Sequence, residues 1–118
     1  MKTLQEKITE LNKLVLAGNA LEAFERFYHP DVAMQENSQP AVVGKEANRQ
    51  REIEFYGKVT GFYEHAKALE VTVGNNVTMV KWAYDYHHED WGKKSYTQIS
   101  VQHWKDDQII NEQFFYGN

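Results

Sequence analysis

The stretch VTMVKWAYDYHH at Val77–His88 is followed by SYTQISVQHW at Ser95–Trp104 and by a third run, which begins at Gln108 or Ile109 and ends at Tyr116. All three are rich in the β-branched and aromatic residues that strands favour. The intervening stretches, DWG at 90–92 and KDD at 105–107, carry the Gly and Asp residues that hairpin turns use. The pattern predicts three consecutive antiparallel strands.

Two further segments upstream also have the character of strands. Residues Phe62–Val73 would form the first long strand of the same meander, and Gly74-Asn75-Asn76 would turn it into the next. Val32–Glu36 is a shorter strand candidate that ends before a polar loop.

The first third of the chain has helical periodicity. Thr3 followed by Glu6 has the form of a capping box, and Asn19 starts a second helix that ends before Pro30. Residues Gly44–Tyr56 are predicted to form a third helix, with Ala47, Ile53 and Tyr56 as its inward residues. The first helix would bury residues that recur at the spacing of one helix face: Leu4, Ile8, Leu11 and Val15.

Helices first and strands afterwards predict an α+β fold, with the helices packed on one face of the sheet. The chain has 118 residues and shows no linker or repeat. We therefore expect residues 1–118 to form a single domain.

Composition excludes several classes of protein. The chain has no cysteine, which rules out disulfides and thiolate chemistry and fits a reducing compartment. The net charge is −4 without any cluster of Lys and Arg, which disfavours nucleic acid as a partner. No apolar run is long enough to span a bilayer, and the first residues lack the apolar stretch of a signal peptide. We expect a soluble, cytoplasmic protein that binds neither nucleic acid nor membrane.

Aromatic residues make up 14% of the chain, and most of them lie from Phe62 onward. Aromatic side chains fill protein cores, and they also line ligand pockets that contain few polar groups. The sequence leaves both interpretations open.

Four segments resemble the nuclear-transport-factor-2-like superfamily, and within it the SnoaL-like group of polyketide cyclases and ketosteroid isomerases. They are Phe27–Val32, Gly44 at the start of the third helix, Val80-Lys81-Trp82 in a central strand, and Trp104–Glu112 around the last hairpin. The resemblance covers nearly the whole chain. It implies a cone-shaped, cystatin-like α+β barrel, in which the N-terminal helices pack in the concave face of a strongly curved, mainly antiparallel sheet.

In such a cone, alternate residues of each strand face the interior. The family pattern places Glu36 and Glu112 inward, and His65 is a further inward candidate. The other inward positions would be the walls of a binding cavity or plain core: Trp82, Tyr84, Tyr86, Tyr96, Gln98, Ser100, Gln102, Phe114 and Tyr116.

Three titratable residues are the candidates for catalysis. Glu36 matches the position of the isomerases' carboxylate base, and an apolar cavity would raise the pKa of such a carboxylate. Glu112 would be either a second acid or a structural hydrogen-bonding group bound to Gln98, Gln102 or Tyr96. His65 is the candidate cavity acid or base, with a cross-strand contact as its alternative.

The catalytic sets of the resembling enzymes are not intact. Asn12 and Ser100 occupy the positions of the isomerases' oxyanion donors, and Ser100 also stands near the place of the cyclases' histidine. Phe114 stands where the cyclases carry an acid. Two functions therefore stay open: an isomerase, cyclase or hydrolase of a small ring-containing molecule with Glu36 as proton acceptor, or a non-catalytic binding or dimeric interaction module.

The sequence gives no sign of a cofactor or of metal-ligand spacing among its histidines. Apolar residues such as Ile99 and Val101 would face outward, and an apolar outer sheet face needs a cover. We expect a homodimer through that face.

Overall fold

The computed structural model describes residues 2–117. Its elements are, in chain order, α1 (Leu4–Leu16), α2 (Ala20–Phe27), β1 (Tyr28–Glu36), β2 (Val42–Val43), α3 (Lys45–Gly57), β3 (Val59–Thr60), α4 (Phe62–His65), β4 (Lys67–Val73), β5 (Val77–His88), β6 (Gly92–Lys105) and β7 (Gln108–Tyr116).

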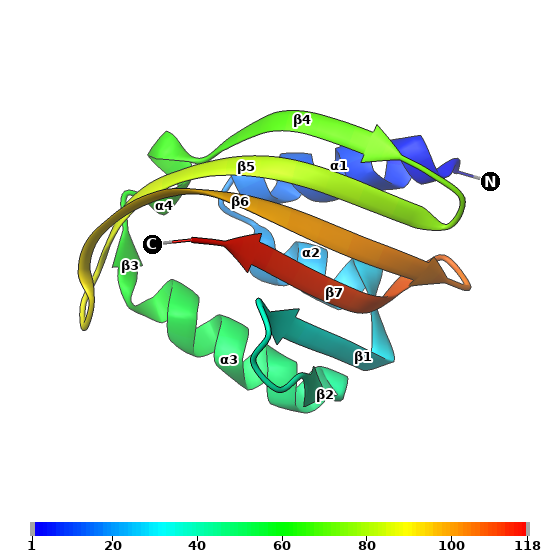
Figure 1. Ribbon diagram of the computed structural model, residues 1–118, viewed down its shortest axis with the longest axis horizontal. Helices are drawn as coiled ribbons and strands as arrows, with labels where there is room; N and C mark the ends of the chain where they lie inside the picture. Colours follow the sequence, from blue (N-terminus) through cyan, green and yellow to red (C-terminus); the bar gives the residue numbers. More distant parts are fainter. Residues whose placement is uncertain (1, 118) are drawn as a thin grey trace.

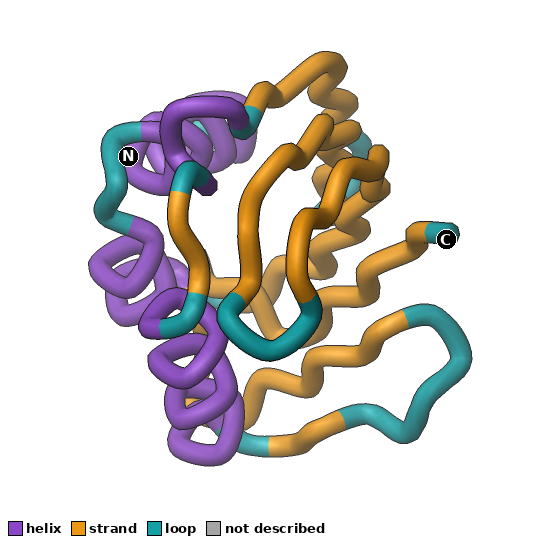
Figure 2. Tube along the Cα trace, turned by 90° about the vertical axis from the view of Figure 1, so that its left-hand side faces the viewer, coloured by secondary structure: helices purple, strands orange, loops and turns teal. Residues whose placement is uncertain are grey.

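All strands belong to one curled sheet with the order β2-β1-β7-β6-β5-β3, and β4 pairs with another part of β5 (Figure 1). The β1–β7 pair is parallel and the other pairs are antiparallel. Figure 2 shows the helices gathered along one side, where the sheet curls toward them. The predicted α+β cone, with helices in the concave face of a mainly antiparallel sheet, is confirmed.

The helix signals have mixed outcomes. Thr3 and Glu6 form the predicted capping box at the start of α1. Asn19 precedes α2, but its side chain caps nothing. The strand β1 begins at Tyr28, earlier than predicted, and passes through Pro30.

The prediction of one strand over Phe62–Val73 is wrong at its start. Phe62–His65 form the short helix α4, preceded by Gly61 in the left-handed conformation with φ 76°, and β4 begins only at Lys67. Phe62 is buried against Phe55 and Tyr86. Packing of the Phe62 ring therefore outweighs the strand propensity of this segment, and the segment is helical.

The predicted strand parity is confirmed from the sheet register. Gln102 pairs with Glu112, and Gln98 pairs with Tyr116, so these side chains share one face. Trp82 opposes Gln98 on the next strand. Every long strand after β4 therefore presents its predicted inward residues to the concave side.

Two apolar clusters fill the concave side. The larger joins α1 and α2 to the sheet around Ile8, Phe24 and Trp104. The smaller surrounds Phe62 and Tyr86 near the opposite end. The aromatic residues thus supply core and pocket walls at once.

Apolar side chains also stand on the convex face. Val101 opposes Met79 and Ile99 opposes Phe115, and Met79 and Phe115 are each 43% exposed. We call Met79, Ile99, Val101 and Phe115 the outer patch. The homodimer that the sequence suggests through this face stays a prediction.

That prediction can be measured by sedimentation. The wild-type chain is expected to sediment at twice the mass of one chain, and Phe115→Lys is expected to sediment as a monomer, because it places a charge in the outer patch. Val43→Lys is the matched control, since Val43 is 69% exposed on β2, away from the patch. A monomeric wild type would contradict the dimer, and equal dissociation of both variants would contradict an interface through the outer patch.

Within residues 2–117, no helix has the length and apolar character needed to cross a bilayer. The cytoplasmic location stays a prediction.

Candidate functional site

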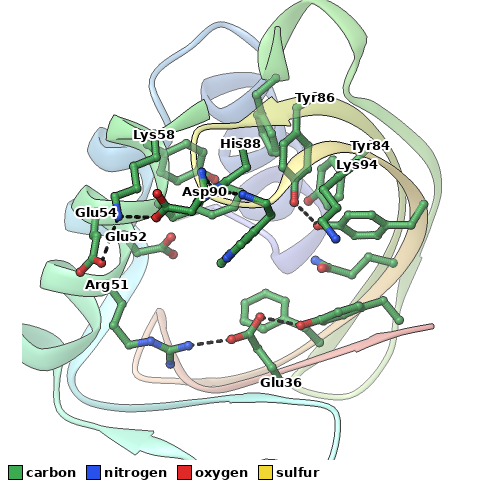
Figure 3. Close-up of a pocket in the computed structure, with 18 of the residues that line it drawn as sticks. Glu36, Arg51, Glu52, Glu54, Lys58, Tyr84, Tyr86, His88, Asp90 and Lys94 are labelled. Atoms are coloured by element: carbon green, nitrogen blue, oxygen red, sulfur yellow. Dashed lines mark hydrogen bonds and ion pairs between the residues drawn. The ribbon is translucent and has the colours of Figure 1, made fainter. Parts of the chain in front are cut away.

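A pocket of about 970 Å³ opens between α3 and the curled ends of β5, β6 and β7 (Figure 3). Its wall combines aromatic rings with charged groups. Phe55 and Tyr56 come from α3, and Tyr84, Tyr86 and Phe114 come from the sheet.

A small inner cavity of about 60 Å³ lies deeper, between the helices α1 and α2 and the sheet. The two spaces are neighbours, because they share four wall residues: Glu52, Tyr56, Tyr84 and Phe114. We call these four residues the shared wall.

The structure brings most of the predicted site residues together. Outer-pocket residues are Glu36, Tyr84, Tyr86, Tyr96, Gln98, Phe114 and Tyr116. Inner-cavity residues are Trp82, Tyr84, Ser100, Gln102, Glu112 and Phe114. His65 is the exception: it is exposed at the end of α4 and lines neither space, because its segment is helical where a strand was predicted.

Glu36 stands at the rim and not in a desolvated interior. Its Oε2 accepts a hydrogen bond from Arg51 at 2.6 Å, and its Oε1 accepts one from Tyr116 at 2.8 Å. The side chain of Glu36 is 40% exposed. Both carboxylate oxygens are engaged, so the expected environment of a buried base is absent at this residue.

Glu112 lies at the centre of a buried hydrogen-bond network. The Tyr28 hydroxyl donates to its Oε1, and Gln102 donates to its Oε2 at 2.8 Å. Thr78 donates to Gln102 Oε1 at 2.6 Å, and Trp104 Nε1 donates to Thr78 at 2.9 Å. The expected contact between Glu112 and Gln102 is confirmed. Burial raises the pKa of Glu112 to about 7, although the bonds from Tyr28 and Gln102 oppose that rise.

Glu52 is the acid that the sequence reasoning missed. It lies on α3 in the wall shared by the pocket and the inner cavity. Burial raises its pKa to about 8, and the negative charge of Glu112 adds to the rise while Arg51 opposes it. Among residues 2–117, no group donates a hydrogen bond to the Glu52 carboxyl, so this carboxyl is available to a ligand.

Helical spacing could have indicated Glu52, but its side chain is polar and so does not mark a buried face. Of the three residues of this helix predicted to face inward, Tyr56 does so, whereas Ala47 and Ile53 are exposed. The inward positions are Asn48, Glu52, Phe55 and Tyr56, which share the same helical spacing.

Two tyrosine hydroxyls complete the shared wall. Burial raises the pKa values of Tyr56 and Tyr84 well above the ordinary value, so both stay neutral and can donate hydrogen bonds. Neither hydroxyl bonds to another of the described residues. Asn12, in the isomerase donor position, is buried with its Oδ1 unpartnered but lines neither space.

The described part of the chain holds no group of three or more Asp, Glu or His side chains placed to bind a metal ion.

The elements and their order define a small cone-shaped α+β protein. A model of the SnoaL-like domain matches residues 3–116, and the chain therefore belongs to the SnoaL-like domain family. No match was found among curated proteins.

Solved structures with the same fold cover nearly the whole chain. A candidate SnoaL-like polyketide cyclase from Mesorhizobium loti aligns with a TM-score of 0.79 at 18% identity, covering 98% of this chain and 100% of that one. A protein of ketosteroid-isomerase-like fold from Catenulispora acidiphila, in complex with trimethylamine, aligns at 0.76 and 12%, covering 98% and 88%. An LEH-like epoxide hydrolase from M. tuberculosis aligns at 0.71 and 12%, covering 92% and 79%. At such identities the likeness shows the fold alone.

The half-buried Glu52 predicts how stability depends on pH. The folded state keeps protons on Glu52 that the unfolded state loses above the ordinary carboxyl pKa of 4.5. The free energy of unfolding contributed by Glu52 therefore falls as pH rises from about 4.5 to about 8. Glu52→Gln should be more stable than wild type by about 2 kcal/mol at about pH 9, after a discount for partial exposure.

Urea unfolding at acidic and alkaline pH measures this difference. Glu70→Gln is the control, because Glu70 is exposed on β4 and has no ion pair among the described residues. An equal effect of both variants at alkaline pH would show that Glu52 is not a desolvated acid.

Proposed function

We propose that this protein binds a small, largely apolar, ring-containing molecule in the pocket between α3 and the sheet, and that Glu52 exchanges a proton with it. The observation that carries the proposal is the unpaired Glu52 carboxyl in an aromatic wall, next to a second buried carboxyl at Glu112.

Size and lining support a small-molecule ligand. Ligand pockets commonly enclose roughly 300–1,000 Å³ and combine apolar walls with a few placed polar groups. The pocket has about 970 Å³. Its aromatic walls suit a ring, and the neutral hydroxyls of Tyr56 and Tyr84 suit a carbonyl or epoxide oxygen on that ring.

The electrostatics support proton transfer. A general acid or base works best when its pKa lies near the working pH, and burial brings Glu52 into that range. Glu112 is held by Tyr28 and Gln102, so it acts on Glu52 through its charge. Two buried acids with different surroundings are a recurring acid–base arrangement.

The roles follow from the positions of these groups. As a base, the Glu52 carboxylate takes the proton from a carbon beside the ligand's carbonyl, and the electron pair of that C–H bond moves into an enolate. Tyr56 and Tyr84 donate hydrogen bonds to the enolate oxygen. Isomerisation or cyclisation would proceed from this enolate, and hydrolysis would use the protonated form of Glu52 as a donor. Glu36 becomes a rim residue that holds Arg51.

A non-catalytic binding module is the second candidate. It is favoured by the residues at the family's catalytic positions: Asn12 lines neither space, and Phe114 provides a wall in place of an acid.

Exchange of the α-protons of β-tetralone in D₂O separates the two candidates. Wild type should accelerate exchange, with a rate that rises with pH through about 7 to 9, because the Glu52 carboxylate forms in that range. The exchange rate should fall about 100-fold in Glu52→Gln and about tenfold in Tyr84→Phe. NMR of the ketone reports the rate.

Glu70→Gln is the matched control and should exchange as fast as wild type, because Glu70 is exposed on β4 and lines neither space. Binding of β-tetralone is measured separately by thermal shift, where a ligand at about 100 times its dissociation constant adds about 2.7 kcal/mol. A thermal shift without proton exchange would support the non-catalytic binding module. Exchange that Glu52→Gln leaves unchanged would refute the role of Glu52.

A further inference from the structure

The mouth of the pocket has polar groups that proton transfer at Glu52 does not use. They lie where β5 and β6 meet at the turn after His88. This end of the sheet carries a buried histidine and a lysine on the same inner face.

His88 is held in one orientation by the turn that follows it. The backbone N–H groups of Asp90 and Trp91 donate to its Nδ1 at 3.1 Å and 3.3 Å. The Trp91 ring stacks on the imidazole, with the centroids 3.7 Å apart. Because Nδ1 is an acceptor, the neutral ring carries its proton on Nε2.

The proton on Nε2 has no hydrogen-bond partner among the described residues. His88 is only 2% exposed, yet it lines the pocket. Among residues 2–117, Asn12 Oδ1 is the one side-chain polar atom that is fully enclosed and lacks a hydrogen bond. His88 Nε2 also bonds to none of these residues, so it is not fully enclosed. Its N–H group therefore opens on the pocket as a fixed donor.

Lys94 supplies a positive charge beside that donor. It pairs with Tyr86, and His88 pairs with Gly92, so His88 and Lys94 are diagonal neighbours on one face. Such neighbours lie about 7–8 Å apart, which leaves room for one small group between them. Figure 3 draws Lys94 beside Tyr84 and Tyr86 in the pocket wall.

Two other cations in the pocket wall are already matched. Arg51 bonds to Glu36 at 2.6 Å, and Lys58 bonds to Asp90 at 2.6 Å. Lys93 also lines the pocket without an ion pair among the described residues, but it is exposed and alternates with Lys94 along β6. Among the described residues, no carboxylate lies within ion-pair distance of Lys94. The pocket therefore presents an unmatched positive charge, together with a buried donor, at its mouth.

We propose that His88 and Lys94 form an anion subsite, and that the ligand is an aromatic or alicyclic carboxylate. This inference rests on the proposed function: the ring lies against the aromatic wall near Glu52, and the carboxylate lies between Nε2–H of His88 and the ammonium group of Lys94. Charge-assisted hydrogen bonds of this kind are the stronger ones. The subsite selects acids over their neutral analogues.

Calorimetric titration with β-naphthoate and β-naphthamide at neutral pH tests the subsite. The two probes share one ring system and differ in the charge of one group. Wild type should bind the naphthoate at least about tenfold more tightly, as expected for charged hydrogen bonds. Added salt should weaken naphthoate binding and leave naphthamide binding unchanged.

Variants assign the preference to the two residues. Lys94→Met should reduce the naphthoate preference about tenfold, and Lys94→Arg should retain it. His88→Asn removes the Nε2–H donor but keeps an acceptor near Nδ1 for the turn, and it should also reduce the preference. Lys105→Met, on an exposed lysine at the other end of β6, should behave as wild type.

The outcomes distinguish this inference from the proposed function. Equal binding of both probes by wild type would overturn the subsite and leave a ring-binding pocket. Equal effects of Lys94→Met and Lys105→Met would overturn it as well. Binding of neither probe would overturn both proposals.

Discussion

One buried hydrogen-bond network constrains the concave side of this protein. It runs from Trp104 through Thr78 and Gln102 to Glu112 and ends at Tyr28. The network links β5, β6, β7 and the start of β1, and removing any member would strand a buried polar group at a cost of about 1–3 kcal/mol. It therefore fixes the register of the strands that enclose the pocket, and it places a carboxyl group inside an apolar interior.

That placement determines the electrostatics of the pocket. Tyr28 and Gln102 occupy both oxygens of Glu112, so its charge can act only on its neighbours. Glu52 faces this charge from α3 and receives no hydrogen bond from the described residues. The two acids then share a wall with neutral tyrosine hydroxyls, while the positive charge of Lys94 stands at the mouth. The pocket therefore has acidic groups at its inner end and a positive charge at its mouth.

Strand periodicity carried most of the fold, because alternation along β5, β6 and β7 is long enough to fix which face is buried. The family resemblance then supplied the parity that puts Gln102, Glu112 and Tyr116 on the inner face. It failed where packing overrides local preference, as at Phe62–His65, whose helical turn depends on contacts with α3 and β5. Glu52 was missed because a polar residue on a weakly amphipathic helix is predicted to face solvent. His88 was missed as a donor because its orientation depends on a turn that only the folded chain forms.

The central claim is that Glu52 and Glu112 are desolvated and interacting acids. The most direct measurement is an NMR titration of the glutamate side-chain carboxyl carbons. The pair is expected to titrate with apparent pKa values near 7 and 8, well above the ordinary carboxyl value of 4.5. Titration of both acids near that ordinary value would contradict the claim.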